Sequence, residues 1–418
     1  MDVFNLRNQV INDYGKYVRS FVTIRDEGID RLVGAELDRG FLWPDPLIQL
    51  NPSFEPGEPF QELIGNGELH PECINIFRDK GEDGSVGEPY RLHRHQVDGI
   101  RAARAGDNYV LTTGTGSGKS LAYIVPIVDH VLRRGSGQGI QAIIVYPMNA
   151  LANSQIGELE KFLHRGYPRG RSPVTFRRYT GQESDDERKE IIANPPDILL
   201  TNYVMLELVL TRPWDYQLIE HAKGLRFLVL DELHTYRGRQ GADVAMLVRR
   251  LREACKAPNL LHVGTSATLA GGGSWTEQQA EVAEVASLLF GAEVKGSCVI
   301  GETLRRSTPE YQPDDAAFVD RLSERLRSGT APGAGDANGF LADPLSSWIE
   351  STLGLQREAA SDRLVRCKPR ALTGSDGVAA ALSSLTGVDP DDCERQLQKN
   401  LLTGYLSRDC DITHPVGR

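Results

Sequence analysis

The residues with the clearest capacity for chemistry lie in a glycine-rich stretch, YVLTTGTGSGKS, which runs from Tyr109 to Ser120. A short apolar run turns there into a loop whose backbone N–H groups are free to surround a polyphosphate. Lys119 can reach the β- and γ-phosphates, and Ser120 offers its hydroxyl to Mg²⁺. Thr113 departs from the usual pattern, which has Gly or Ala at that position, so an ordinary glycine-rich turn is the alternative. The predicted phosphate-binding set is Thr115, Gly116, Ser117, Gly118, Lys119 and Ser120.

A pair of carboxylates follows a second apolar run, FLVLDELH, from Phe227 to His234. The four apolar residues predict a buried strand, and ligands of an open parallel sheet bind at the carboxyl edge of its strands. Asp231 is placed to hold Mg²⁺ through water, and Glu232 to polarise the attacking water in phosphoryl transfer. His234 could couple this site to its surroundings. The alternative is a strand end capped by Asp-Glu, which the preceding phosphate loop disfavours.

A third segment, GTSATL, runs from Gly264 to Leu269 and again ends an apolar run. The hydroxyls of Ser266 and Thr268 could bridge the carboxylate edge to a neighbouring element. Ser-Ala-Thr alone is usually a loop, and it is informative here because it follows DELH on the next predicted strand. We therefore expect Ser266 and Thr268 to act in coupling.

These segments belong to a region in which short β-branched runs alternate with helical patterns. Helical periodicity is clear over residues 150–163 and 242–255, where apolar side chains recur on one face. Apolar strands alternating with helices predict a parallel sheet covered on both faces. The predicted strands are Tyr109–Thr112, Ala142–Tyr146, Val174–Tyr179, Ile198–Thr201, Phe227–Leu230 and Leu261–Gly264.

Sequence texture divides the chain into three predicted parts. Residues 1–89 form an N-terminal accessory region that mixes helical periodicity with a proline-rich, irregular stretch. Residues 90–270 hold the motifs described above. Residues 271–418 are expected to be a mainly helical accessory region.

Bulk composition is that of an ordinary globular protein. The 418 residues are 40% hydrophobic and 25% charged, with a net charge of −10. Five arginines nevertheless gather between residues 165 and 178, which could be a phosphate-binding face or simply a solvated surface. The six cysteines contain no CxxC pair, which argues against a zinc site and a disulfide framework. Without a signal peptide or an apolar stretch of ~20 residues, we expect a cytoplasmic protein with no membrane partner.

TGTGSGKS, DELH and SAT, in this order, resemble motifs I, II and III of the superfamily 2 DExD/H-box helicases. The resemblance implies a RecA-like fold for residues 90–270, with ATP and Mg²⁺ as cofactors. It also implies that Gln96, in LHRHQ, reads adenine, although a plain surface residue is the alternative. YPMNALANSQ, YTGQ and PDILLTNY resemble the segments that touch phosphates and sugars of one strand rather than bases. The implied nucleic-acid contacts are Pro147, Asn149, Ala150, Thr180, Gly181, Thr201 and Asn202.

Within the superfamily, VLTTGTGSGKSL and LVLDELHTYRGRQGADVAMLVRRLR look like large bacterial DExH helicases related to the Mrr-associated DNA helicases, some of which serve phage defence. Such enzymes close two RecA-like domains on ATP, and the second domain carries an arginine finger in a QxxGRxGR pattern. No such pattern follows Thr268. We therefore expect an N-terminal part of a longer protein, near-inactive alone because that arginine is missing.

The favoured interpretation is the N-terminal motor half of an ATP-dependent DNA helicase or translocase. Its expected partners are single-stranded or duplex DNA, the second RecA-like domain of the same full-length protein, and defence or repair proteins. An RNA helicase is one alternative, because the same motifs touch a backbone that RNA shares. An ATP-sensing nucleic-acid-binding scaffold without motor activity is another.

Overall fold

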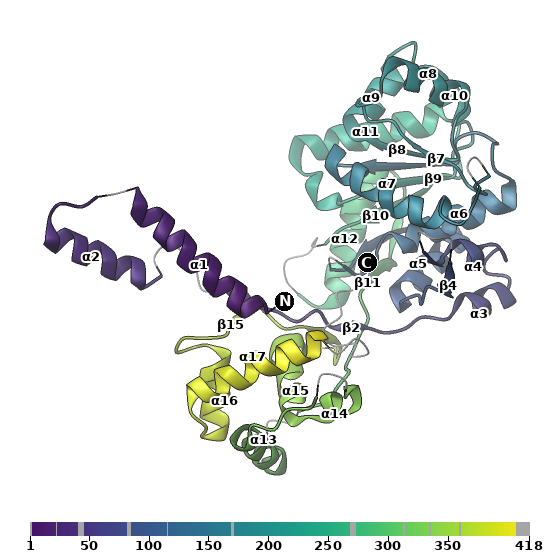
Figure 1. The fold of residues 1–418 in the computed structure, drawn as a ribbon. Helices are drawn as coiled ribbons and strands as arrows, with labels where there is room; N and C mark the ends of the chain where they lie inside the picture. Colours follow the sequence, from purple (N-terminus) through teal and green to yellow (C-terminus); the bar gives the residue numbers. More distant parts are fainter. Residues whose placement is uncertain are drawn as a thin grey trace. The chain divides into compact units, whose positions relative to one another are not determined.

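A computed structural model describes residues 2–21, 23–40, 46–81, 85–114, 116–168, 171–267, 273–311, 314–333, 336–358 and 361–406. The chain divides into two units, whose folds appear in Figure 1. One unit consists of residues 54–303. The other combines residues 1–53 with residues 304–415.

The unit of residues 54–303 is built on a parallel sheet with seven strands among the described residues, in the order β11-β5-β10-β9-β6-β8-β7. All neighbouring strands in it run parallel. This sheet confirms the predicted α/β class. The strands are β5 (Asn108–Thr112), β6 (Ala142–Tyr146), β7 (Phe176–Arg178), β8 (Ile198–Asn202), β9 (Phe227–Leu230), β10 (Leu261–Thr265) and β11 (Val294–Gly301).

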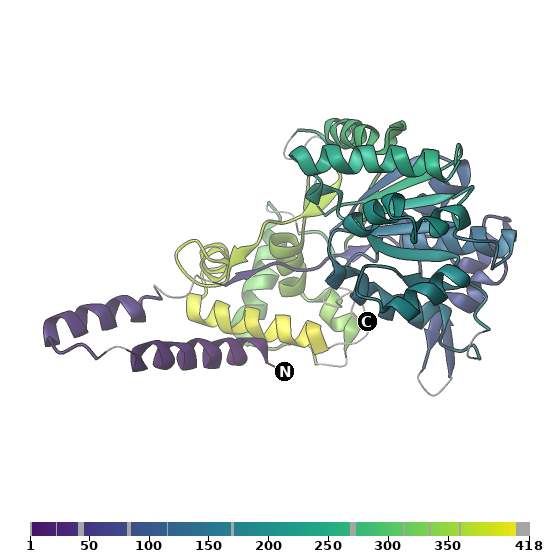
Figure 2. The same ribbon diagram turned by 90° about the horizontal axis from the view of Figure 1, so that it is seen from above.

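Helices cover both faces of the sheet, as Figures 1 and 2 show. Apolar side chains of α3 to α7 pack into the core on one face, and those of α8 to α12 into the core on the other. The first group is α3 (Phe60–Gly65), α4 (Cys73–Ile76), α5 (Arg94–Ala105), α6 (Leu121–Arg134) and α7 (Asn149–Leu163). The second is α8 (Asp185–Ala193), α9 (Tyr203–Thr211), α10 (Tyr216–His221), α11 (Gly238–Ala254) and α12 (Trp275–Phe290).

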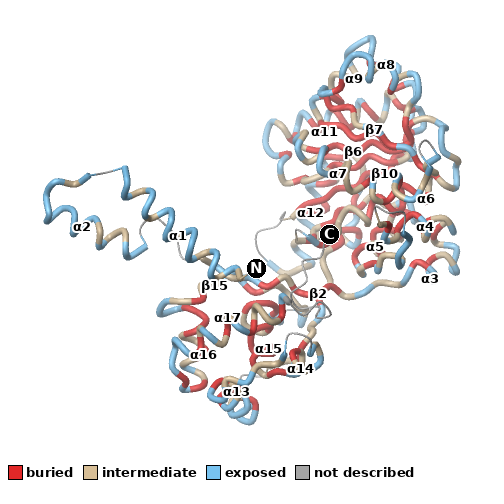
Figure 3. Tube along the Cα trace, in the orientation of Figure 1, coloured by how far each residue is buried: buried red, intermediate tan, exposed pale blue. Residues whose placement is uncertain are grey.

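Successive apolar residues of β5, β6, β8 and β9 belong to opposite cores. In β5, Tyr109 and Leu111 pack into the first core, whereas Val110 packs into the second. Every residue of β6, β8, β9 and β10 is buried, and Figure 3 shows these strands in red. Strands buried on both faces read as continuous apolar runs, which is why the sequence pattern located them.

The edge strand β11 lies beyond residue 270, the expected end of the motif-bearing region. It pairs with β5, and Gly301 lies opposite Thr112 at the start of the phosphate loop. The range 90–270 therefore encloses six of the seven strands in the described sheet. A short antiparallel hairpin, β3 (Arg78–Lys80) and β4 (Val86–Pro89), also belongs to this unit.

The other unit is mainly helical and has its own core. Its centre holds Leu322, Leu345, Leu353, Leu382 and Leu397, all buried. Its helices are α1 (Val3–Ser20), α2 (Glu27–Asp38), α13 (Ala316–Ser328), α14 (Ala337–Ala342), α15 (Pro344–Ile349), a π-helical turn (Glu350–Gly354), α16 (Val378–Thr386) and α17 (Pro390–Leu406). The short strands are β1 (Leu47–Ile48), β2 (Ser53–Phe54), at the division between the units, β12 (Leu304–Arg305), β13 (Leu355–Arg357), β14 (Leu364–Arg366) and β15 (Arg370–Ala371).

No residue of α1 or α2 is buried among those described. Of the helices in the described part of the chain, none combines the length and apolar character needed to cross a membrane.

Candidate functional site

Three predicted motifs meet at the carboxyl edge of the sheet. They follow β5, β9 and β10, which are neighbours in the order β5-β10-β9. Thr265 of β10 lies opposite Leu111 of β5, and Gly264 lies opposite Leu230 of β9. The register therefore brings the glycine-rich loop, DELH and GTS to one edge, where open α/β sheets bind ligands.

Two glycines of the glycine-rich loop have a left-handed backbone. Gly116 and Gly118 have φ values of 78° and 69°, a left-handed region that favours glycine. A Cβ on Gly118 would also lie 2.6 Å from Nε2 of Gln96. The loop then leads into α6, whose N-terminus favours an anion. Thr115 lies outside the described residues.

Lys119 holds an unbonded ammonium group at the centre of this site. Its Nζ is buried and has no hydrogen-bond partner among the described residues. The nearest recorded carboxylate oxygen is Oε1 of Glu232, at 3.9 Å, which is longer than a charge-assisted hydrogen bond of about 2.7–2.9 Å. A buried donor without a partner is what a phosphate-binding lysine requires.

The two carboxylates of DELH are held differently. Asp231 accepts a hydrogen bond from the Thr265 hydroxyl, and burial raises the pKa of its carboxyl group despite that bond. Glu232 has a left-handed backbone with φ of 53°, and its N–H donates to the same hydroxyl over 3.1 Å. A non-glycine residue in this region is uncommon and is typical of functional sites. Thr265, which the sequence analysis did not single out, thus orients both residues.

His234 and Ser266, two of the residues predicted to act in coupling, are in contact. Nδ1 of His234 lies 3.3 Å from the Ser266 hydroxyl in a hydrogen bond. The same nitrogen lies 3.2 Å from Oε2 of Glu232, close enough for an ion pair when the imidazole is protonated. Thr268 lies outside the described residues.

The side chains suited to Mg²⁺ are an alcohol and a carboxylate. The Ser120 hydroxyl donates a long hydrogen bond to Oε1 of Gln155, at 3.4 Å, and Asp231 supplies oxygen ligands. Mg²⁺ at nucleotide sites is typically held by one or two protein oxygens together with substrate phosphates. These residues and the unbonded Lys119 ammonium are therefore suited to binding a nucleoside triphosphate with Mg²⁺.

Gln96 and its neighbour His95 form hydrogen bonds with carbonyl groups of the glycine-rich loop. The Gln96 amide accepts from the His93 N–H at 2.8 Å and donates to the Gly118 carbonyl at 2.8 Å. His95 Nε2 lies 3.0 Å from the Ser117 carbonyl, and the hydroxyls of Thr113 and Ser117 lie 2.6 Å apart. Gln96 is buried, so it is not a plain surface residue. A side-chain amide can donate two hydrogen bonds and accept two, and these contacts use one of each. The remaining positions could reach a base, so the contact of Gln96 with adenine stays a prediction.

Five of the seven predicted nucleic-acid residues line one depression. These are Pro147, Asn149, Thr180, Gly181 and Asn202. Nδ2 of Asn202 donates to Oδ1 of Asn149 at 2.6 Å, which joins the end of β8 to the start of α7. The structure does not place Ala150 or Thr201 in its lining. Ala150 is exposed, and the buried Thr201 hydroxyl donates to the Tyr179 carbonyl at 2.7 Å.

Two backbone amides in this depression already have an anionic partner. Oε2 of Glu183 accepts from the N–H groups of Thr180 and Gly181 at 2.8 and 2.9 Å. Oε1 accepts from Nε of Arg178 at 2.7 Å. Burial by itself would raise the pKa of Glu183, but these hydrogen bonds outweigh it and the pKa is lowered. The sequence did not predict this role of Glu183, because a single Glu after YTGQ matches no motif.

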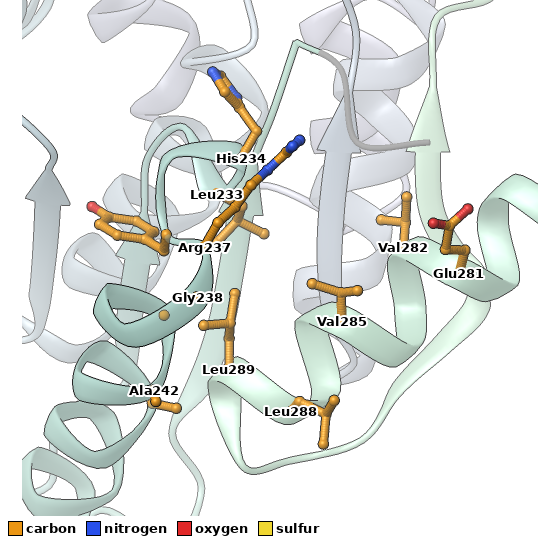
Figure 4. A pocket seen from close by; sticks show the side chains of 13 residues that line it. Leu233, His234, Arg237, Gly238, Ala242, Glu281, Val282, Val285, Leu288 and Leu289 are labelled. Carbon is orange, nitrogen blue, oxygen red and sulfur yellow. The ribbon is translucent and has the colours of Figure 1, made fainter. Parts of the chain in front are cut away.

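A groove that the sequence did not predict lies beside DELH. Leu233, His234 and Arg237 line one part of it, and residues of α11 and α12 line the rest. Figure 4 shows Val282, Val285, Leu288 and Leu289 projecting from α12 along this groove. The groove places apolar surface next to His234.

A parallel sheet with a glycine-rich GKS loop after β5 and the DELH carboxylates after β9, with β10 between these two strands, defines a RecA-like nucleotide-binding domain. Residues 93–272 match the DEAD/DEAH box helicase family. The chain therefore carries a DEAD/DEAH box helicase domain.

Several proteins are similar to the chain. Druantia protein DruE of Escherichia coli is 26% identical over 56% of this chain and 19% of its own length. The uncharacterized ATP-dependent helicase YprA of Bacillus subtilis is 30% identical over 43% of this chain and 23% of its own. The crystal structure of the DUF1998 helicase MrfA bound to DNA has a TM-score of 0.47 at 22% identity, over 62% of this chain and 30% of that one. The matched regions thus span about a fifth to a quarter of the two curated relatives.

Proposed function

We propose that this chain forms the ATP-binding motor half of an ATP-dependent nucleic-acid helicase or translocase. The observation that carries the proposal is the buried, unbonded ammonium of Lys119 beside the DELH carboxylates. The helicase family match over residues 93–272 supports it. The second RecA-like domain of a longer protein would complete the motor and supply the arginine finger.

Each residue of the site has a proposed task. Lys119 and the loop from Thr115 to Ser120 hold the phosphates, while Ser120 and Asp231 hold Mg²⁺, which neutralises charge on the phosphates when it is bound. Glu232 orients the attacking water and accepts its proton. His234 and Ser266 pass a change at Glu232 to β10 through their hydrogen bond, and Thr268 would extend that path.

For the nucleic acid, we propose contacts from the seven residues named in the sequence analysis, with DNA favoured over RNA. The preference for DNA and the proposed role in phage defence or repair rest on the resemblance to the Mrr-associated DNA helicases. Comparing stimulation of ATP turnover by single-stranded DNA and RNA in the full-length protein separates the two. An ATP-sensing scaffold would bind both ligands without turnover there.

The first prediction concerns Lys119→Ala. Binding of ATP·Mg²⁺ to the 418-residue chain, measured by isothermal titration calorimetry, should weaken about 10- to 100-fold, because a hydrogen bond to a charged group contributes about 1.5–3 kcal/mol. The melting temperature should not fall, since the ammonium has no recorded hydrogen bond to lose. Lys295→Ala removes a lysine at the start of β11 and should leave binding unchanged. Equal ATP affinity in Lys119→Ala and the parent chain would show that the phosphate-loop assignment is wrong.

A further inference from the structure

The depression that holds the predicted strand-contacting residues has a one-sided charge. Of the described residues lining it, the charged ones are Arg188 and Arg212, and both are cations. Arg188 comes from α8 and Arg212 directly follows α9. The sequence analysis assigned neither residue a role. The surface is therefore positive on a protein whose net charge is −10.

Two backbone amides of this depression are already bound to an anion of the protein itself. Glu183 already accepts the N–H groups of Thr180 and Gly181. Thr180 and Gly181 are residues that the family resemblance implies to contact phosphates and sugars. An anionic ligand cannot use these two amides unless it displaces a buried carboxylate that also accepts from Arg178.

Arg188 has N–H donors that no group in the described residues accepts. Its Nη2 donates to the Gly181 carbonyl at 3.1 Å, which ties the side chain to the loop. Its Nε is buried without a hydrogen-bond partner in the described part of the chain. Its Nη1 lies 3.9 Å from the carboxylate of Asp185, too far for a strong charge-assisted bond. A guanidinium has five N–H donors in a fixed fork, so Arg188 is oriented but not saturated.

Arg212 is similarly under-used. Its Nη1 lies 4.0 Å from Oδ2 of Asp215, and the other oxygen of that carboxylate accepts from the hydroxyl of Tyr179. The Arg212 side chain is 46% exposed. Its charge is therefore only weakly compensated and can reach a ligand in the depression.

We propose that Arg188 and Arg212 are the phosphate-binding side chains of this depression and take the phosphodiester backbone of a nucleic-acid strand. Glu183 serves as the internal anion that fixes the Thr180–Gly181 loop, so the side chains rather than the loop amides carry the charge recognition. Asn149, at the N-terminus of α7, adds a polar contact where the helix dipole favours an anion. The inference rests on the proposed function, because it names residues of the same nucleic-acid site.

The test is binding of fluorescent oligo(dT) and oligo(U) of equal length to the 418-residue chain, followed by anisotropy at several salt concentrations. Arg188→Gln and Arg212→Gln should each weaken binding about tenfold. Each should also lower the slope of log K against log[salt] by about 1, because one phosphate contact is lost. Arg188→Lys should keep the slope while weakening binding, since it retains the charge but not the fork. A preference between the two oligonucleotides identifies the source of the backbone.

Arg134→Gln is the matched control. Arg134 is exposed in the last turn of α6, which starts at the phosphate loop and so ends toward the opposite edge of the sheet. It should leave affinity and slope unchanged. If the parent chain binds the oligonucleotides and the Arg188 and Arg212 variants keep its salt slope, the inference is overturned and the proposed function stands. If the parent binds ATP but neither oligonucleotide, nucleic-acid binding by this half fails as well. If Arg188→Gln lowers the melting temperature, the affinity and salt slope of Arg212→Gln test the inference instead.

Discussion

Around the glycine-rich loop and DELH, three buried polar atoms make no hydrogen bond in the described part of the chain: Nζ of Lys119, Nδ1 of His95, and Oε2 of Glu232, whose near neighbour is the His234 ring at 3.2 Å. Proteins satisfy most buried polar groups, so such exceptions need an explanation. Lys119 and Glu232 were predicted as catalytic from sequence spacing. Their unmet hydrogen-bonding capacity is consistent with a site that is completed by its ligand.

The hydrogen bonds around His95 determine which ring nitrogen carries the proton. Nε2 faces the Ser117 carbonyl, which can only accept, so Nε2 must carry the hydrogen in the neutral ring. The imidazolium form would place a second proton on Nδ1, which is buried without a partner. Burial accordingly lowers the pKa of His95 to about 4. His262 is held in the same way. Its Nδ1 forms a hydrogen bond with Oδ1 of Asn108, and burial lowers the pKa of its ring to about 4.

These shifts predict a loss of stability in mild acid. A histidine with a lowered folded-state pKa binds fewer protons than the unfolded chain, so the free energy of unfolding falls as pH drops from about 6.5 towards 4. In His95→Gln, Nε2 of the amide can still donate to Ser117. Urea unfolding at pH 7 and pH 5 should show a pH-dependent loss about 2 kcal/mol smaller than in the parent chain. The remaining loss includes the part from His262, and an unchanged pH dependence would contradict the assigned protonation.

At the scale of elements, the end of β10 organises the catalytic edge. Its last residue, Thr265, bonds both carboxylate-bearing residues of the neighbouring strand end, and Ser266 bonds His234. This requires DELH to lie close against β10. Gly264 permits it, because a Cβ there would lie 2.9 Å from Cγ of Leu233 and 3.2 Å from Cζ of Phe290.

Gly264→Ala should therefore destabilise the sheet edge. Leu233 and Phe290 are both buried, so they cannot move aside freely, and overpacking of this kind costs about 1–3 kcal/mol. Guanidinium unfolding followed by fluorescence measures the loss. Gly296→Ala is the control, because a Cβ there meets nothing within 4 Å, and its effect should stay within about 0.5 kcal/mol. Equal stabilities of the two variants would mean that the close packing is not required.

The sequence predicted the elements whose patterns are local. The six apolar runs became β5 to β10, and the helical periods at 150–163 and 242–255 became α7 and α11. It did not predict β11, whose run VKGSCVIG mixes Lys, Gly and Ser with apolar residues and has a register shift after Val294. Thr265, His95 and Glu183 were missed for a different reason. Their roles depend on hydrogen bonds that only the packed sheet and loops create.

At the scale of the whole molecule, the chain has separate cores. The sheet unit has one core on each face, and the unit of residues 1–53 and 304–415 has a third. Units with separate cores can unfold as separate cooperative blocks. ATP·Mg²⁺ would bind wholly within residues 54–303, so its stabilising effect should depend on how strongly the blocks are coupled.

Hydrogen exchange with and without ATP·Mg²⁺ measures this coupling. A ligand that binds only the folded state adds about 2.7 kcal/mol at 100 times its Kd, so amides of β5, β9 and β10 that exchange by unfolding of the sheet unit should slow about 100-fold. Amides in α13, α16 and α17 should be unaffected, because their core contains no residue of the nucleotide site. Lys119→Ala, with its weakened ATP binding, should show little protection anywhere and controls for non-specific effects of the nucleotide. Equal protection of both blocks would instead show that they unfold as one, and that ATP binding stabilises the accessory unit as well as the motor.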